Sequence, residues 1–158
     1  MVMVVRKATK EDMPQVLGLI KELAVFEKEP EAVVITLAEL EAAGFGDNPQ
    51  FTCFVAEMNS EIVGMALVYF RFSTWVGNTV HLEDLIVKEH MRGKGIGIAL
   101  YKKVMEYSKA QGVKRVNWMV LGWNKDAIAF YENTGAKVLE EWWQVEMNQT
   151  ALDNFLSK

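Results

Sequence analysis

Two acidic residues and a glycine-rich turn are the most chemically suggestive features of the sequence, and they share the stretch His81–Leu100. Glu83 and Asp84 lie among apolar residues with strand character. Because side chains alternate along a strand, we expect these two carboxylates on opposite faces of a sheet. One of them can then face a cleft and take a proton from a substrate. For Glu83, a salt bridge at a strand edge is an equal alternative from the sequence alone.

The turn after this strand, Arg92–Gly97 with the sequence RGKGIG, indicates an anion-binding site. Glycines at alternate positions let the backbone turn tightly and leave its N–H groups open to a ligand. A helix begins within the turn and runs through Tyr107, so its positive end points at the same place. The two commonest nucleotide signatures do not fit, because no Ser or Thr follows Lys94 and Ile98 replaces the third glycine of the dinucleotide fingerprint. Taken alone, the motif could also be a plain glycine-rich turn.

Length and composition restrict the class of protein. The 158 residues suffice for one domain with one core, and 24% charged and 51% hydrophobic residues are typical of a compact soluble protein. The net charge of −4 argues against a nucleic-acid partner and suits a cationic substrate. With Cys53 as the single cysteine and only two histidines, we expect no disulfide, no metal site and a cytoplasmic location. No apolar run is long enough to span a membrane, and residues 1–20 lack a signal-peptide pattern.

The elements that must position these residues follow the order strand, two helices, three strands, helix, strand, helix, strand. This order predicts a mixed α/β domain. Asn59 and Ser60 connect a β-hairpin, and a later turn presents Trp75. We expect strands at Met3–Val5, Phe51–Met58, Ile62–Phe72, from Thr79, at Val113–Leu121, at Val138 and at Trp142–Met147, and helices after the caps Thr9 and Thr36, through Leu100 to Tyr107, over Asn124–Asn133 and after a cap at Thr150.

Seven separated segments carry a resemblance to known proteins: LIKELAVFE at 19–27, GFG at 44–46, YF at 69–70, WVG at 75–77, HLEDLIV at 81–87, RGKGIG at 92–97 and WNKDAIAFYENTGA at 123–136. They resemble the GNAT superfamily of N-acetyltransferases, and most closely its diamine (spermidine/spermine) and thialysine N-acetyltransferases. The turn at 92–97 resembles the loop that holds the pyrophosphate of acyl-CoA in that superfamily. The resemblance implies the GNAT fold, a mixed and mostly antiparallel central sheet flanked by helices, as a single domain over residues 1–158.

The resemblance also implies a site for acetyl-CoA. Amides of the glycine-rich loop hold the pyrophosphate in the family, and an asparagine matched by Asn124 contacts the cofactor. The expected cofactor-binding residues are Leu85, Ile86, Val87, Arg92, Gly93, Lys94, Gly95, Ile96, Gly97, Asn124 and Tyr131.

Two catalytic residues follow from the same resemblance. The family glutamate matched by Glu83 acts through water as the base for the amine, and the tyrosine matched by Tyr131 is the acid for the departing thiolate. A carboxylate meets a chemical need, because freeing an amine of pKa about 10.4 from its proton at neutral pH costs on the order of 4 kcal/mol. Without the resemblance, Tyr131 is better interpreted as a core aromatic residue beside Phe130 on an amphipathic helix.

We therefore expect an acetyl-CoA-dependent N-acetyltransferase whose acceptor is a primary amine of a small molecule, either a diamine, a polyamine or a thialysine-like amino acid. The polyamine enzymes carry an acid shortly before the tryptophan matched by Trp75, whereas this chain has FST at 72–74, so one anchor for a long polycation is missing. A catalytically silent acyl-CoA-binding or regulatory module and a peptide or protein N-acetyltransferase are the alternatives. The expected acceptor-binding residues are Glu27, Trp75, Glu83 and a late tryptophan, either Trp142 or Trp143.

The apolar residues at 142–147 also predict a homodimer. This stretch carries more large side chains than one sheet edge can expose without association, and the related acetyltransferases are dimers. The alternative is that both tryptophans cover the core of a monomer.

Overall fold

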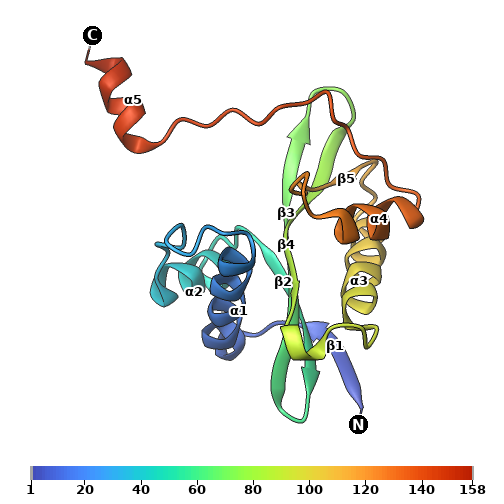
Figure 1. Ribbon diagram of the computed structural model, residues 1–158. Helices are drawn as coiled ribbons and strands as arrows, with labels where there is room; N and C mark the ends of the chain where they lie inside the picture. Colours follow the sequence, from blue (N-terminus) through green and yellow to red (C-terminus); the bar gives the residue numbers. More distant parts are fainter. Residues whose placement is uncertain (1, 158) are drawn as a thin grey trace. The chain divides into compact units, whose positions relative to one another are not determined.

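The computed structural model describes residues 2–157, and the chain forms two units, Met1–Met119 and Val120–Lys158. The first unit contains a five-stranded sheet in the order β1-β2-β3-β4-β5 (Figure 1). Its first four strands pair antiparallel, and β5 pairs parallel with β4. The elements are β1 (Met3–Lys7), η1 (Lys10–Asp12), α1 (Met13–Phe26), α2 (Leu37–Phe45), β2 (Thr52–Met58), β3 (Glu61–Ser73), β4 (Gly77–Val87), η2 (Glu89–Met91), α3 (Ile96–Ala110) and β5 (Val116–Asn117).

The sheet separates two apolar cores. Helices α1 and α2 cover one face and α3 covers the other (Figure 1). Because neighbouring residues of a strand face opposite ways, Cys53 and Val55 pack toward α1 while Phe54 and Ala56 pack toward α3. Buried residues of the α1 face include Met13, Val16, Leu19, Met65, Leu67 and Ile86, and those of the α3 face include Val68, Val80, Leu82, Ile96, Leu100 and Val104.

Both predicted capping boxes are confirmed. The backbone N–H of Thr9 donates to the Asp12 carboxylate at 2.7 Å, and the backbone N–H of Glu39 donates to the Thr36 hydroxyl at 3.2 Å. The first box is reinforced by Arg6, which forms a salt bridge with Asp12 at 2.6 Å. These contacts satisfy N–H groups that a helix end leaves without a partner, so η1, which leads directly into α1, and α2 begin where the sequence predicts.

Two β-bulges interrupt the register of the sheet. At the first bulge, Ala56 pairs with Gly64 and the next residue, Glu57, pairs with Ile62. Val63 is therefore left without a partner on β2. A second bulge lies between β3 and β4. A bulge adds one residue to one strand, so the side-chain alternation changes phase there. In β4 this change lies between Leu82, which packs on the α3 face, and Ile86, which packs on the α1 face.

The second unit contains two helices, α4 (Lys125–Asn133) and α5 (Gln149–Leu156), neither of which has a buried residue. Asn124 caps α4 by accepting from the backbone N–H of Ala127 at 3.3 Å. The cap of α5 is Asn148, which accepts from the backbone N–H of Ala151 at 2.9 Å, so the prediction of a cap at Thr150 is wrong. The Asn148 carboxamide is the better placed acceptor because it precedes the first helical residue.

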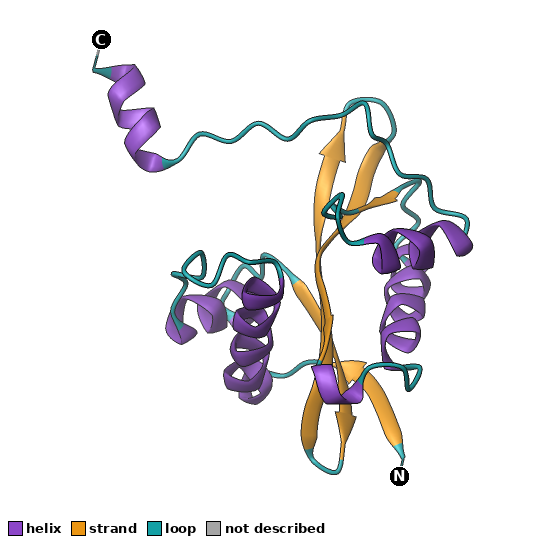
Figure 2. Cartoon of the chain, viewed as in Figure 1, coloured by secondary structure: helices purple, strands orange, loops and turns teal. Residues whose placement is uncertain are grey.

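The strand predictions after residue 112 are largely wrong. Only Val116–Asn117 of the stretch 113–121 pairs as a strand, and neither Val138 nor residues 142–147 form one (Figure 2). Residues 139–142 instead form a turn in which the N–H of Trp142 donates to the carbonyl of Leu139 at 3.4 Å. Alternating apolar residues favour a strand only where a neighbouring strand supplies ladder hydrogen bonds, and residues 142–147 have none. None of the helices within residues 2–157 is long and apolar enough to cross a membrane.

Candidate active site

Glu83 occupies the second bulge of the sheet. Leu67 pairs with Asp84 and Val68 pairs with Leu82, so Glu83 is the extra residue of β4. Cross-strand partners share a face, so Asp84 lies on the α1 face with Leu67. Glu83 contacts Tyr69, which also packs on that face. The prediction that the two acids point to opposite faces is therefore wrong, because the bulge resets the alternation between them.

The Glu83 carboxylate is exposed at its tip and fixed at one oxygen. The hydroxyl of Tyr69 donates to Oε2 at 2.9 Å, and Nε2 of His81 lies 3.4 Å from the same oxygen. Its side chain is 49% exposed. The nearby His81 imidazole, followed by the Tyr69 hydroxyl, lowers the pKa of Glu83, although partial burial acts in the opposite direction. Glu83 is thus an ionised carboxylate at neutral pH, with its other oxygen accessible to a ligand.

Two further carboxyl groups lie near Glu83 and titrate differently. Burial, with the charges of Glu83 and Glu27, raises the pKa of Asp84 to about 6, and burial raises the pKa of Glu27. Glu27 directly follows the last residue of α1, so the C-terminal end of that helix brings a third acid to this part of the α1 face. Among residues 2–157, no group of three or more His, Cys, Asp or Glu side chains is arranged to hold a metal ion. The three carboxyl groups give this part of the α1 face a negative charge that suits a cation.

One edge of β4 is open beyond these acids. β5 pairs with β4 only at Val80 and His81, so the strand continues from Leu82 to Val87 without a partner strand on that side in the described part of the chain. Backbone groups along such an edge can bind an extended ligand. The predicted cofactor-binding residues Leu85, Ile86 and Val87 all lie on this open stretch.

The glycine-rich turn after β4 has the conformation that its sequence predicts. Gly93 and Gly95 have φ values of 74° and 80°, which disfavour residues with a side chain, and Gly95 precedes the first residue of α3. An added Cβ at either glycine would meet no atom within 4 Å, so the backbone here is open to a ligand. Gly97 is not in this strained region, and its added Cβ would only touch Val87 at 3.8 Å.

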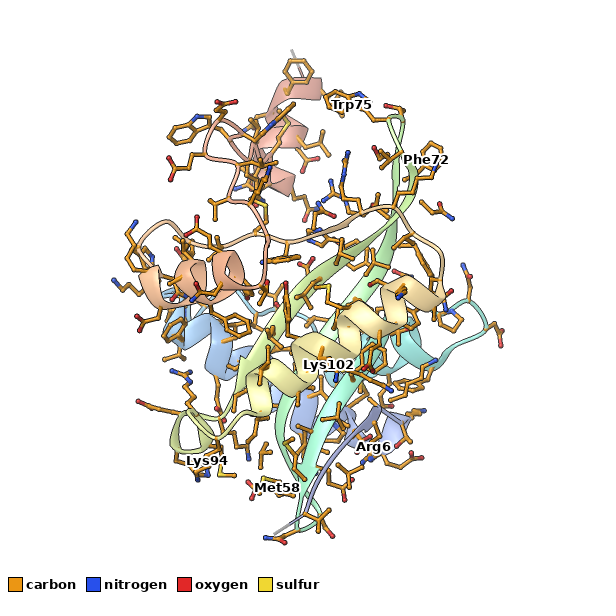
Figure 3. The ribbon with its side chains drawn as sticks, turned by 90° about the vertical axis from the view of Figure 1, so that its right-hand side faces the viewer. Arg6, Met58, Phe72, Trp75, Lys94 and Lys102 are labelled. Carbon is orange, nitrogen blue, oxygen red and sulfur yellow. The ribbon has the colours of Figure 1, made fainter. Side chains whose placement is uncertain are left out.

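The two basic residues of the turn differ in how firmly they are held. The Nε of Arg92 donates to the carbonyl of Val87 at 3.2 Å, and its guanidinium lies over the ring of Phe26 at 5.0 Å from the centroid. Lys94 makes one weak contact, with the sulfur of Met91 at 3.4 Å, and lies in the turn before α3 (Figure 3). Arg92 therefore braces the turn against β4 and α1, whereas Lys94 can reorient toward an anion.

Trp75, a predicted acceptor residue, is not beside Glu83. It lies at the tip of the β3–β4 hairpin with Phe72 nearby, at the opposite end of the sheet from Lys94 (Figure 3). Its side chain is 77% exposed. Gly77 and Glu83 are six steps apart along an extended strand, which corresponds to roughly 20 Å. Within the first unit, the structure thus brings together Glu27 and Glu83 but not Trp75.

The remaining predicted residues belong to the second unit. Asn124 is the cap of α4, and Tyr131 lies on that helix with its ring packed edge-on against Phe130 at 5.3 Å between centroids. The pairing with Phe130 agrees with the alternative interpretation of Tyr131, although the ring is only partly buried. Trp142 and Trp143 lie in the segment without helix or strand, where they are 70% and 88% exposed.

The residues that surround Glu83 are not among those predicted from the sequence. His81 is 6% exposed, and its ring packs against that of Tyr69 at 5.1 Å between centroids. The sequence does contain a signal for His81, because it is a polar residue in an apolar strand, two positions before Glu83. The contact of Tyr69 with Glu83 has no such signal, since it depends on the register of β3 and β4. Tyr69 also borders a cavity of about 390 Å³ at the end of β2, lined in part by Lys7, Phe51 and Cys53.

An open strand edge, a glycine-rich turn with an open backbone and an ionised carboxylate are features that an acyltransferase site requires, and the comparisons with known proteins point to the same class. Residues 13–136 match the profile of the acetyltransferase (GNAT) family. Thialysine N-epsilon-acetyltransferase of Sus scrofa is 41% identical over 145 residues, which cover 87% of this chain and 85% of the relative. Its counterpart of Caenorhabditis elegans is 36% identical and covers 93% and 92%. The protein belongs to the acetyltransferase (GNAT) family.

Solved structures confirm the fold. An integron cassette protein from the mobile metagenome of V. cholerae has a TM-score of 0.80 at 20% identity, covering 100% of this chain and 99% of that one. An aminoglycoside acetyltransferase from an uncultured soil metagenomic sample has a TM-score of 0.73 at 18% identity, covering 91% and 97%. The predicted GNAT fold, N-acetyltransferase class and transfer of an acetyl group to an amine of a small molecule are confirmed at this level.

Proposed function

We propose that this protein transfers the acetyl group of acetyl-CoA to the terminal primary amine of a thialysine-like amino acid or a short diamine. The observation that carries the proposal is Glu83, an ionised and accessible carboxylate held at a bulge of β4 close to an open strand edge. The names of the relatives support the acceptor class, because two relatives that are 41% and 36% identical over most of this chain are thialysine N-epsilon-acetyltransferases.

The residues of the first unit fit acetyl-CoA, whose thioester supplies the acetyl group when it is bound. Gly93 and Gly95 keep the turn open to a pyrophosphate, and the N-terminal end of α3 adds a positive potential. Arg92, Gly93, Lys94, Gly95, Ile96 and Gly97 would hold the phosphates, and the open edge of β4 at Leu85–Val87 would hold the extended arm.

The chemistry requires one base and one acid. Glu83 would accept the proton that the ammonium must lose, through a water molecule, before the nitrogen bonds to the acetyl carbon. Tyr131 would donate its proton to the sulfur that leaves, and Asn124 would contact the cofactor. The assignments of Tyr131 and Asn124 to this site rest on the family resemblance of residues 123–136.

The charges near Glu83 support a cationic acceptor of limited length. Glu27 and Asp84 add negative charge at the α1 face, which raises the local concentration of an ammonium compound. Residues 72–74 offer no carboxylate that could bind the far end of a long polycation. We therefore expect acceptors with one distal amine to be better substrates than spermine.

A panel of amines with acetyl-CoA tests the proposal. Thialysine, L-lysine, L-ornithine, putrescine, spermidine and spermine would each be incubated with the protein, with release of the coenzyme A thiol as the readout and mass spectrometry of the product to locate the acetyl group. We expect acetylation at the terminal amine, fastest with thialysine or a diamine.

Two variants complete this experiment. Glu83→Gln should lower turnover by roughly 10² to 10⁴, the usual contribution of a general base, whereas Glu106→Gln on the exposed face of α3 should not change it. Binding of acetyl-CoA without thiol release in the presence of any amine would favour the silent acyl-CoA-binding module. Equal turnover in Glu83→Gln and the parent protein would show that another group is the base.

We also propose that the chain acts in the cytoplasm as a homodimer with one acetyltransferase domain over residues 1–158. Support for the dimer comes from the four large apolar side chains of residues 142–147, which are all more than half exposed. Exposed apolar residues at this density favour association, and in a two-fold dimer Trp143 of one subunit could complete the acceptor site of the other.

Light scattering coupled to size-exclusion chromatography tests the assembly. We expect a mass of twice 17.9 kDa at micromolar concentration, and a shift toward the monomer when Trp143 and Val145 are both replaced by Ser. A parent protein that is monomeric, and fully active on dilution, would contradict the dimer.

A further inference from the structure

Three polar side chains form a connected group behind Glu83 on strands β3 and β4. The buried imidazole of His81 lies between the guanidinium of Arg71 and the carboxylate of Glu83. Nη1 of Arg71 is 3.1 Å from Nδ1 of His81, and Nε2 of His81 is 3.4 Å from Oε2 of Glu83. The hydroxyl of Tyr69 donates to the same oxygen at 2.9 Å. Arg71 is itself exposed, so the group extends from the surface to the carboxylate.

The contact with Arg71 fixes the proton of the His81 ring. A guanidinium has hydrogen-bond donors and no acceptor, so Arg71 must be the donor and Nδ1 of His81 the acceptor. The remaining proton of a neutral imidazole is then on Nε2, the nitrogen that faces Glu83. The backbone of Arg71 is held in turn by Thr79, whose hydroxyl donates to its carbonyl at 3.1 Å.

We propose that His81 is a positioning residue for acetyl transfer: Arg71 holds it in the Nε2–H tautomer, and His81 and Tyr69 together occupy one oxygen of Glu83. The other oxygen, Oε1, is thereby directed to the water or amine that it must deprotonate. This inference rests on the proposed function, since it assigns the three residues to the base of that reaction.

The electrostatics of the surrounding groups agree with this arrangement. His81 is the largest cause of the lowered pKa of Glu83, Tyr69 adds to it, and the charge of Arg71 contributes. The other charged groups facing this part of the sheet, Asp84 on β4 and Glu27 at the end of α1, are carboxyls whose own pKa values are raised. The contact with His81 thus favours the ionised form of Glu83 as well as fixing the direction of its carboxylate.

Substitution of His81 separates positioning from simple packing. His81→Phe keeps an aromatic ring but removes both nitrogens, so we expect turnover about 10- to 100-fold lower with the KM for acetyl-CoA unchanged, as for other residues that orient a reactive group. The pKa of Glu83, followed by carboxyl ¹³C NMR, should rise. Glutamine can accept from Arg71 and donate to Glu83, so His81→Gln should recover most of the turnover and the lower pKa of Glu83.

Arg71→Met supplies a second variant at an exposed position, where misfolding is not expected. The chain has two histidines, so His90→Gln assigns the ¹⁵N signals of His81. We expect the parent protein to show the Nε2–H tautomer and Arg71→Met to show a mixture, with a smaller loss of turnover than in His81→Phe.

Three results would overturn the inference: an Nδ1–H tautomer in the parent protein, ¹⁵N signals unchanged in Arg71→Met, or parental turnover and Glu83 titration in His81→Phe. The NMR measurements use the resting protein. If no amine is acetylated, the proposed function fails, but the NMR measurements still show whether His81 has the Nε2–H tautomer and lowers the pKa of Glu83. If amines are acetylated equally well by His81→Phe, only the positioning role fails.

Discussion

The glycine-rich turn at 92–97 and the carboxylate group of Glu27, Glu83 and Asp84 lie in the same unit but are suited to ligands of opposite charge. The turn offers backbone N–H groups and leaves space where side chains would be, so it suits an anion. The carboxylate group offers side-chain charge, part of it held in place by neighbouring side chains, so it suits a cation. Added side chains should therefore weaken ligand binding at the turn. At the carboxylate group, loss of a side-chain charge should have the corresponding effect.

The largest effect is expected outside both regions. Tyr131→Phe should lower kcat by roughly 10² to 10⁴, because a lost general acid slows only the chemical step. Binding of acetyl-CoA and of the amine should be unchanged, since neither the turn nor the carboxylates are altered. Stopped-flow turnover with saturating amine measures the loss, and Tyr107→Phe on α3 is the control for removal of a phenol hydroxyl. Full turnover in Tyr131→Phe would assign the acid to another group.

Adding a charge to the turn should weaken cofactor binding by roughly 100-fold or more. Gly97→Asp places a carboxylate beside the expected pyrophosphate, and a like charge a few ångströms away costs several kcal/mol near a protein surface. Gly97 has an ordinary backbone conformation with room for a Cβ, so the fold should tolerate the change. Isothermal calorimetry with acetyl-CoA gives the Kd, and Gly97→Asn is the uncharged control. Parental affinity in the folded Asp variant would remove the phosphate assignment.

Removing a buried charge from the carboxylate group should stabilise the protein. The pKa of Asp84 is raised from 3.8 to about 6, so the folded state binds the proton more tightly than the unfolded state. Stability is therefore lost as the pH rises from about 4 through 6, and Asp84→Asn should increase the free energy of unfolding by about 3 kcal/mol at pH 7.5.

Urea denaturation of both proteins at pH 3.5 and pH 7.5 measures this difference. At pH 3.5 the parent protein carries a neutral Asp84, so the two proteins should be about equally stable. A gain of the same size at both pH values would show that packing, not ionisation, is responsible.

The smallest effect is expected at the edge of the carboxylate group. Glu27→Gln should raise the KM for a diamine about 3- to 10-fold through the loss of one attractive charge, with kcat and the KM for acetyl-CoA unchanged. Steady-state kinetics at 50 mM and 300 mM salt should show the difference shrinking as salt screens the charge. Glu29→Gln, two residues later, is the matched control.

The features that the sequence predicts correctly are those decided by neighbouring residues. The capping boxes at Thr9 and Thr36, the turn at Asn59 and Ser60 and the glycines of the turn at 92–97 each depend on local backbone preferences. The assignments of Glu27 and Glu83 to one region came from a resemblance to known enzymes, and the structure places both near Asp84.

The errors concern features decided by residues far apart in the chain. Glu83 and Asp84 share a face because of a bulge that depends on pairing with β3, and a single strand does not reveal its partner's register. The same holds for Tyr69, which reaches Glu83 only across the sheet. The apolar residues at 142–147 predict a strand, but a strand also needs a neighbouring strand to pair with, and the pattern does not specify one.

The bulge at Glu83 also means that this position is dispensable for the pairing of the sheet. A substitution there would remove the proposed base and leave the strand intact. A deletion would remove the bulge itself, and Leu82 and Ile86 would keep their faces, because their partners on β3 already alternate regularly. Inactive descendants of this chain are therefore expected to keep both cores and to differ either in the residue at position 83 or in the length of β4.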